Sequence, residues 1–134
     1  MAGPRGQRRR RLATLLAAAA VAGCGGPSDA QQVRQTITDF ARATADKDYK
    51  KICNELFAPQ LTLQLRQINL PCEAAMARAF RGVRDPQVSV GTVTVDGTKA
   101  SAQVRSSAAG EKPSQDTIRL VKVDGRWRIA SLGS

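Results

Sequence analysis

Val123-Asp-Gly-Arg-Trp-Arg-Ile129 is the stretch that decides the fold class of this chain. Its Asp-Gly dipeptide is typical of a two-residue β-hairpin turn, and apolar residues alternate on both sides of it. A turn of this length places Lys122 opposite Trp127 and Leu120 opposite Ile129. The stretch therefore predicts a hairpin with one apolar face, on which the Lys122 stem can lie over the indole.

The other face of this hairpin is predicted to be basic, because Arg119, Arg126 and Arg128 share it. A row of cations on a strand face is commonly a solvated surface that discourages pairing with another strand. The same row can instead be a docking stripe for a membrane or an acidic partner. Both interpretations stay open at this point.

More strands are expected upstream of the hairpin. Apolar residues alternate over 88–95, and the alternation slips near Gly91, which predicts a β-bulge. Asp96-Gly97 is a second hairpin signal. Further strands are expected over 100–104 and 117–123, with a polar loop over 108–113 between them.

Helices are expected before the strands, because the apolar period there is 3.6 residues. Ser28 and Gln31 have capping-box spacing, so the first helix should begin near Asp29. Asp48 is a good N-cap for the second helix. The four helices are expected at about 29–45, 49–57, 59–68 and 72–80. The chain is therefore predicted to be α+β, with helices packed on one face of a curved antiparallel sheet of about four strands.

The N-terminus has the layout of a secretory signal. Arginines at 5 and 8–11 precede an apolar run over 12–22. That run has 11 residues, whereas a spanning helix needs roughly 20, so a transmembrane anchor is not expected. Val21-Ala-Gly-Cys24 at its end resembles the lipobox of bacterial lipoproteins. The resemblance implies diacylglycerol on Cys24 and cleavage between Gly23 and Cys24; the alternative is an ordinary signal in which Cys24 has no role.

These features predict a signal peptide over 1–23, a lipidated tether over 24–28 and a single domain over 29–134. Without residues 1–23 the chain has 111 residues, with 16 basic and 11 acidic side chains and a net charge of +5. That charge suits a bacterial membrane surface, an acidic wall polymer or an envelope protein on the extracytoplasmic side. Nucleic acid is not an expected partner, since few aromatic residues are available to stack on bases.

Cys53 and Cys72 remain once Cys24 is assigned to lipid. Each lies on the apolar face of a predicted short helix, and an exported domain meets oxidising conditions. A disulfide between them is expected; the alternative is two reduced cysteines in the core. The sequence has no histidine, which argues against histidine-based catalytic triads and most zinc sites.

The whole domain resembles the cone-shaped fold shared by ketosteroid isomerase and nuclear transport factor. The segments that carry the resemblance are Val93-Thr-Val-Asp-Gly-Thr-Lys-Ala100 and Val123–Ile129, and it covers about 29–134. Asp48-Tyr-Lys-Lys-Ile-Cys53 followed by Pro71-Cys-Glu-Ala-Ala75 looks like exported lipoproteins of this superfamily with a paired cysteine. The resemblance implies a cone that holds a small apolar ligand, a cone with a catalytic carboxylate, or a docking surface.

We expect a non-enzymatic accessory module that acts through its surface, with no catalytic residue, cofactor or metal. Phe40, Phe57 and Phe80 have enough bulk to fill the cone. The alternative is a carrier or sensor with an apolar pocket, in which Tyr49 and Trp127 are the candidate wall residues; Trp127 can equally be a core anchor. An isomerase- or dehydratase-like enzyme is the third hypothesis.

Overall fold

The computed structural model describes residues 25–133. The predicted signal peptide, Gly23 and Cys24 lie outside the described residues, so lipidation and cleavage stay predictions. Within 25–133, no helix is both long enough and apolar enough to cross a membrane.

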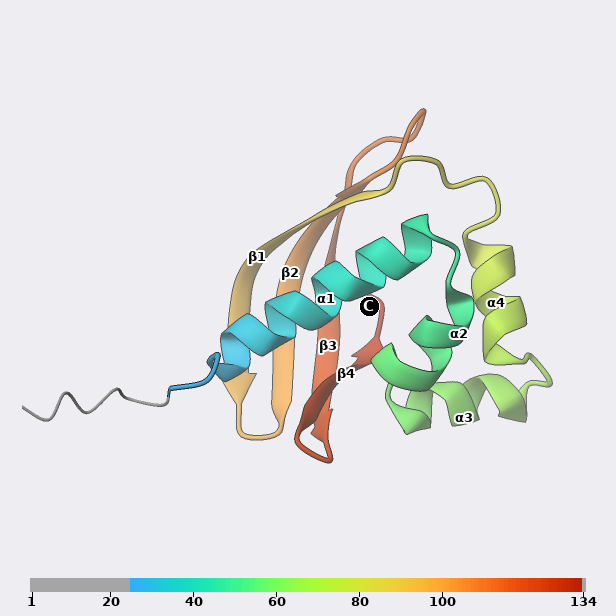
Figure 1. Ribbon diagram of the computed structural model, residues 1–134. Coiled ribbons are helices and arrows are strands. Elements are labelled where there is room, and N and C mark those ends of the chain that lie inside the picture. Colours follow the sequence, from blue (N-terminus) through green and yellow to red (C-terminus); the bar gives the residue numbers. More distant parts are fainter. Residues whose placement is uncertain (1–24, 134) are drawn as a thin grey trace, which may run out of the picture.

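Helices come first and strands follow, as predicted for an α+β domain (Figure 1). The helical elements are α1 (Asp29–Ala45), α2 (Tyr49–Lys51), the π-helix η1 (Ile52–Leu56), α3 (Pro59–Gln67) and α4 (Cys72–Ala79). The strands are β1 (Gln87–Asp96), β2 (Lys99–Ser107), β3 (Ser114–Val123) and β4 (Arg126–Ser131).

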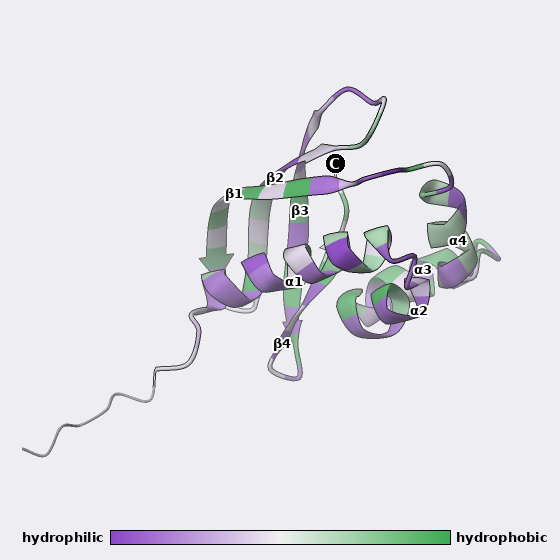
Figure 2. Cartoon of the chain, turned by 45° about the horizontal axis from the view of Figure 1, so that its top comes forward, coloured by the Kyte–Doolittle hydropathy of each residue, from purple (hydrophilic) through white to green (hydrophobic). Residues whose placement is uncertain are grey.

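The strands form one antiparallel sheet in the order β1-β2-β3-β4. The predicted pairs Lys122 with Trp127 and Leu120 with Ile129 are both present. Hydrophobic and more hydrophilic residues alternate along β1 and β2 (Figure 2), as expected where one face of a sheet is buried. The sheet curves, and its concave side receives the helices (Figure 1).

Helix α1 lies across the concave face of the sheet (Figure 1). It begins as predicted, because the Ser28 hydroxyl accepts from the Gln31 backbone N–H and the Gln31 side chain accepts from the Ser28 N–H. Val33, Ile37 and Phe40 are buried on the side that faces the strands. Burial of such side chains is worth about 1.5–3 kcal/mol each, which makes this stripe a major source of stability.

The predicted β-bulge lies in β1, where the pairing with β2 shifts between Val90 and Val93. The Arg34 guanidinium on α1 donates to the carbonyl oxygens of Val90, at 2.9 Å, and Gly91, at 2.7 Å. A bulge leaves backbone groups without partners in the ladder. Arg34 therefore satisfies two of these carbonyls and ties the helix to the bent part of the sheet.

The second predicted helix is interrupted. Only three residues are α-helical before the chain widens into the π-helix η1, which the apolar period did not indicate. Ile52, Cys53 and Leu56 are all buried in this wider turn. Phe57 then leaves the helix in extended conformation and forms a parallel bridge with Ile129. Packing against β4 thus overrides the local helical period.

The predicted disulfide between Cys53 and Cys72 is present, with the two Cα atoms 5.9 Å apart. It links η1 to the first residue of α4. The cysteines are 19 residues apart in the sequence, so the bond closes a loop that contains all of α3. It therefore holds together the helical part that is least covered by the sheet.

We expect the disulfide to contribute about 3 kcal/mol to the free energy of unfolding, because it restricts the unfolded chain. Replacing both cysteines, Cys53→Ala with Cys72→Ala, should lower that free energy by about this amount in urea unfolding. Reductant should destabilise the parent chain and leave the double variant unchanged. Equal stability of the parent chain with and without reductant would contradict the expectation.

Candidate functional site

A cavity of about 230 Å³ lies at the open end of the cone, between α1 and the sheet. Its wall is mixed. Apolar side chains such as Phe40, Phe80 and Ile118 contribute to it, and Glu111, Lys112 and Asp116 are its charged lining residues. Ligand sites usually have roughly 300–1,000 Å³, so this cavity is below the usual range.

Aromatic packing explains why the cavity is small. The ring centroids of Phe40 and Phe57 are 5.9 Å apart, and those of Phe40 and Phe80 are 6.0 Å apart. These are favourable distances for aromatic pairs. The three phenylalanines fill the interior as the sequence predicts, and the free space is limited to the mouth of the cone.

Neither Tyr49 nor Trp127, the two residues named for a pocket wall, lines this cavity. Tyr49 packs partly buried against the core. Trp127 is 4% exposed and is the core anchor that the sequence also allowed. The tryptophan ring lies near the start of α1, where it donates to Asp29 and lines a separate surface groove, away from the mouth of the cone.

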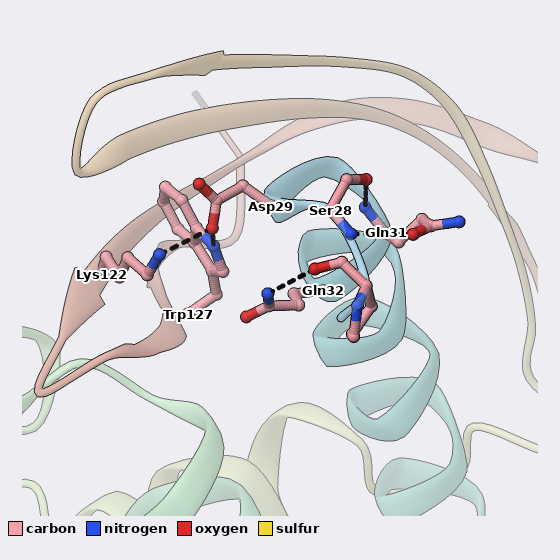
Figure 3. A network of polar contacts seen from close by, with 7 residues as sticks. Ser28, Asp29, Gln31, Gln32, Lys122 and Trp127 are labelled. Carbon is pink, nitrogen blue, oxygen red and sulfur yellow. Dashed lines mark hydrogen bonds and ion pairs between the residues drawn. The ribbon is translucent and has the colours of Figure 1, made fainter. Parts of the chain in front are cut away.

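Asp29 connects the start of α1 to the last hairpin (Figure 3). Its Oδ1 accepts from the Trp127 indole N–H at 2.9 Å and from the Lys122 ammonium at 2.7 Å. The Lys122 Nζ is also 5.7 Å from the centroid of the indole ring, a cation–π distance. Sequence reasoning identified Asp29 only as a helix start, because its two partners are more than 90 residues away.

These contacts stabilise the charged carboxylate. The hydrogen bond from Lys122 and then that from Trp127 lower the pKa of Asp29 below its ordinary value of 3.8. The network joins two distant parts of the chain through one oxygen of Asp29, which favours a structural role. It also fixes the start of α1, directly after residues 25–28.

The convex face of the sheet is basic. Ala100, Ala102, Ile118, Leu120, Trp127 and Ile129 point to the core, so the residues between them point outward. Four of these outward residues are exposed cations: Lys99, Arg105, Arg119 and Arg126. Among the strand residues at outward positions, Asp96 is the only carboxylate. We call this surface the convex basic face.

Arg128 does not belong to the exposed part of this face, contrary to the predicted stripe of three arginines. It is only partly exposed, and its Nη1 donates to the Asn54 carbonyl at 3.0 Å. The cause is the segment around Phe57, which runs along the edge of β4 and draws the Arg128 side chain toward the helices. Arg119 and Arg126 remain exposed as predicted.

No metal centre is visible among residues 25–133, where no group of three or more Cys, Asp or Glu side chains is arranged to hold an ion.

Residues 28–132 match the family Lumazine_bd_2, whose description is "Putative lumazine-binding". The chain belongs to this family. The match includes all the helices and strands described above. Among curated proteins, none matches the chain.

Solved structures show the same fold. An NTF2-like protein of unknown function from Shewanella baltica is 16% identical, with a TM-score of 0.56 over 79% of this chain and 94% of that one. An NTF-2 like protein of unknown function from Silicibacter pomeroyi is 18% identical, with a TM-score of 0.54 over 75% and 88%. A de novo designed NTF2 fold protein is 18% identical, with a TM-score of 0.54 over 79% and 87%. The domain therefore has the NTF2-like cone fold that its sequence resembles.

Substitution of Asp29→Asn should lower the melting temperature at neutral pH, because Lys122 and Trp127 lose their charged acceptor. The pKa of Asp29 is lowered by folding, so this stabilisation is complete above pH 3.8 and is lost as the pH falls through the lower folded-state pKa. The difference between parent and variant should therefore shrink below pH 3.8. Thermal unfolding followed by circular dichroism over this range measures it.

Asp46→Asn is the matched control, since Asp46 is exposed at the other end of α1. That variant should not lower the melting temperature. A constant difference between the parent and Asp29→Asn down to the most acidic pH would show that the charge of Asp29 is not the cause.

Proposed function

We propose that this chain is a lipid-anchored, non-catalytic binding module of the bacterial cell envelope, and that it binds an acidic envelope surface through the convex basic face. The observation that carries the proposal is the charge of that face. Lys99, Arg105, Arg119 and Arg126 are exposed there with Asp96 as the only outward strand carboxylate.

Such a face is attracted to anionic lipid headgroups or acidic polymers. Each lysine or arginine near an anionic surface contributes about 1 kcal/mol, and the attraction decreases over a Debye length of roughly 8 Å at physiological salt. Four cations are therefore sufficient for weak binding that salt reverses. A lipid anchor would supply the additional affinity that such a surface lacks.

The lipid anchor is inferred from the lipobox resemblance of Val21-Ala-Gly-Cys24. Four residues, 25–28, separate Cys24 from the start of α1. A fully extended segment of this length spans at most about 14 Å. Acylated Cys24 would thus keep the domain close to the extracytoplasmic side of the membrane.

The non-catalytic part of the proposal is supported by the site chemistry. The sequence has no histidine, and the carboxylate of Asp29 accepts from Lys122 and Trp127 at a place away from the cone mouth.

The second candidate function is binding of a small ligand. It is favoured by the cavity of about 230 Å³ and by the description of the family as putative lumazine-binding. A small planar ligand could enter the mouth of the cone and lie against Phe40 and Phe80. The cavity is smaller than most ligand sites, so we place this function second.

Cys24→Ala should abolish incorporation of a labelled fatty acid, because the acylated sulfur is absent. Metabolic labelling of the full chain in a bacterial host, followed by membrane fractionation, measures the effect. Accumulated precursor or released domain is expected. A Cys24→Ala chain that still takes up the label and stays in the membrane would contradict the anchor.

Arg119→Glu combined with Lys99→Glu should weaken binding to phosphatidylglycerol vesicles by about tenfold or more, since two charges near the surface change sign. The Cys24→Ala chain is the background, so that acylation does not contribute. Co-sedimentation with phosphatidylglycerol and with phosphatidylcholine vesicles measures binding, and the melting temperature should change little because both side chains are exposed.

Arg78→Glu combined with Arg81→Glu is the matched control, with the same net charge but with exposed residues at and just after the end of α4. Equal loss in both double variants would mean that net charge matters and the convex basic face does not. Saturable lumazine binding that both double variants retain, without vesicle binding by the parent chain, would instead favour the cavity.

A further inference from the structure

Arg128 is a cation without a counter-ion. Its Nη1 donates to the Asn54 carbonyl, and no carboxylate among the described residues lies within salt-bridge distance of it. Its Nε is shielded from solvent and has no hydrogen-bond partner. Partly buried charges are normally paired, because desolvation is costly. Arg128 is therefore held in place through Nη1 and has an unsatisfied donor at Nε.

The side chain lines an open groove of about 870 Å³ between η1, α3, α4 and β4. A second arginine, Arg66 of α3, lines the same groove, together with the neutral polar residues Asn54, Thr62 and Asn69. Accessible apolar surface comes from Leu70, Pro71 and Cys72 of the disulfide, whereas Phe57 and Cys53 border the groove as buried residues. The groove thus combines cationic hydrogen-bond donors with an apolar wall, as small-molecule sites do.

The charged groups around the groove limit the charge of a ligand. Arg66 and Arg128 are its cations, and Glu73 is its one acidic lining residue, so the net charge of the lining is +1. The first residues of α4 also border the groove, and Pro71 at the N-cap provides no side-chain cap. The free N–H groups of this turn add to the positive potential that the arginines create.

We propose that this groove binds a small organic carboxylate. Its carboxylate would accept hydrogen bonds from Arg128 and Arg66, and its apolar body would lie against Leu70, Pro71 and Cys72. A guanidinium fork matches both carboxylate and phosphate, so charge makes the distinction. A carboxylate balances the net charge of +1 on the lining, whereas a dianionic phosphate exceeds it. This site is separate from the convex basic face and from the cavity at the mouth of the cone.

Benzoate and its neutral isostere benzamide are suitable probes. The ¹⁵N-labelled Cys24→Ala chain is titrated with each, and the Arg128 Nε–H signal and the backbone amides of 71–74 are followed by NMR. We expect benzoate to shift these signals saturably and benzamide to leave them unchanged. Inorganic phosphate should bind more weakly than benzoate. Equal responses to benzoate and benzamide, or no saturable shift with benzoate, would overturn the proposal.

Variants separate binding from folding. Arg128→Gln should weaken benzoate binding at least about tenfold, as expected for the loss of a charged hydrogen bond. Because Arg128 also donates to the Asn54 carbonyl, the melting temperature of the Arg128→Gln variant is measured to detect any loss of stability. Arg66→Gln removes an exposed cation that has no hydrogen bond within the described residues, so it should weaken binding about threefold without unfolding the domain.

Glu73→Gln removes the one acidic charge of the lining, whereas the arginine variants remove positive charge. It should therefore tighten benzoate binding about twofold to threefold. Arg105→Gln is the control on the convex basic face and should leave the affinity unchanged. A loss with Arg105→Gln equal to that with Arg66→Gln would show that benzoate responds to overall charge. No effect of Glu73→Gln would show that benzoate does not bind next to Glu73. Either result would overturn the site.

Discussion

The packing of α1 in the hollow of the curved sheet is the constraint on which the rest of the structure depends. Val33, Ile37 and Phe40 supply the buried stripe that the strands surround. Polar contacts then fix the helix to the sheet: Asp29 and Thr36 bind the last hairpin, and Arg34 binds the bulge in β1. The apolar stripe provides the stability, and the polar contacts define the position of the helix.

This arrangement separates the molecule into surfaces with different chemistry. Inside the cone, aromatic side chains leave only a small space at the mouth. The convex side is polar and basic, because every second strand residue must point away from the helices. The third surface is the groove between η1, α3, α4 and β4, which Arg128 of β4 lines. The cavity and the groove share no lining residue, so a ligand bound in one need not affect the other.

Much of the fold could be predicted from sequence because its signals are local. The capping box at Ser28, the slip in alternation near Gly91 and the Asp-Gly turns each determine geometry within a few residues. The π-helix η1 could not be predicted, since packing of Phe57 against Ile129 overrides a regular helical period. Tertiary contacts of this kind leave no signal in a short window of sequence.

The positions of the candidate site residues were less predictable, because they also depend on tertiary contacts. Alternation placed Arg119 and Arg126 correctly on the outside, but it also placed Arg128 there. Arg128 turns toward Asn54 because the chain after η1 runs beside β4, which alternation alone cannot indicate. The partners of Asp29, Lys122 and Trp127, are likewise far along the sequence. The local sequence therefore predicted only that a helix begins near Asp29.

The segment that redirects Arg128 also affects how this domain meets other copies of itself. The Ala58 N–H donates to the Ile129 carbonyl at 2.8 Å, so Phe57 and Ala58 occupy part of the outer edge of β4. At the opposite edge, β1 is bent by its bulge, and two of its carbonyls are already bound by Arg34. Exposed straight edge strands allow sheets to pair edge to edge into aggregates. Both borders of this sheet are therefore protected against pairing with the sheet of another copy.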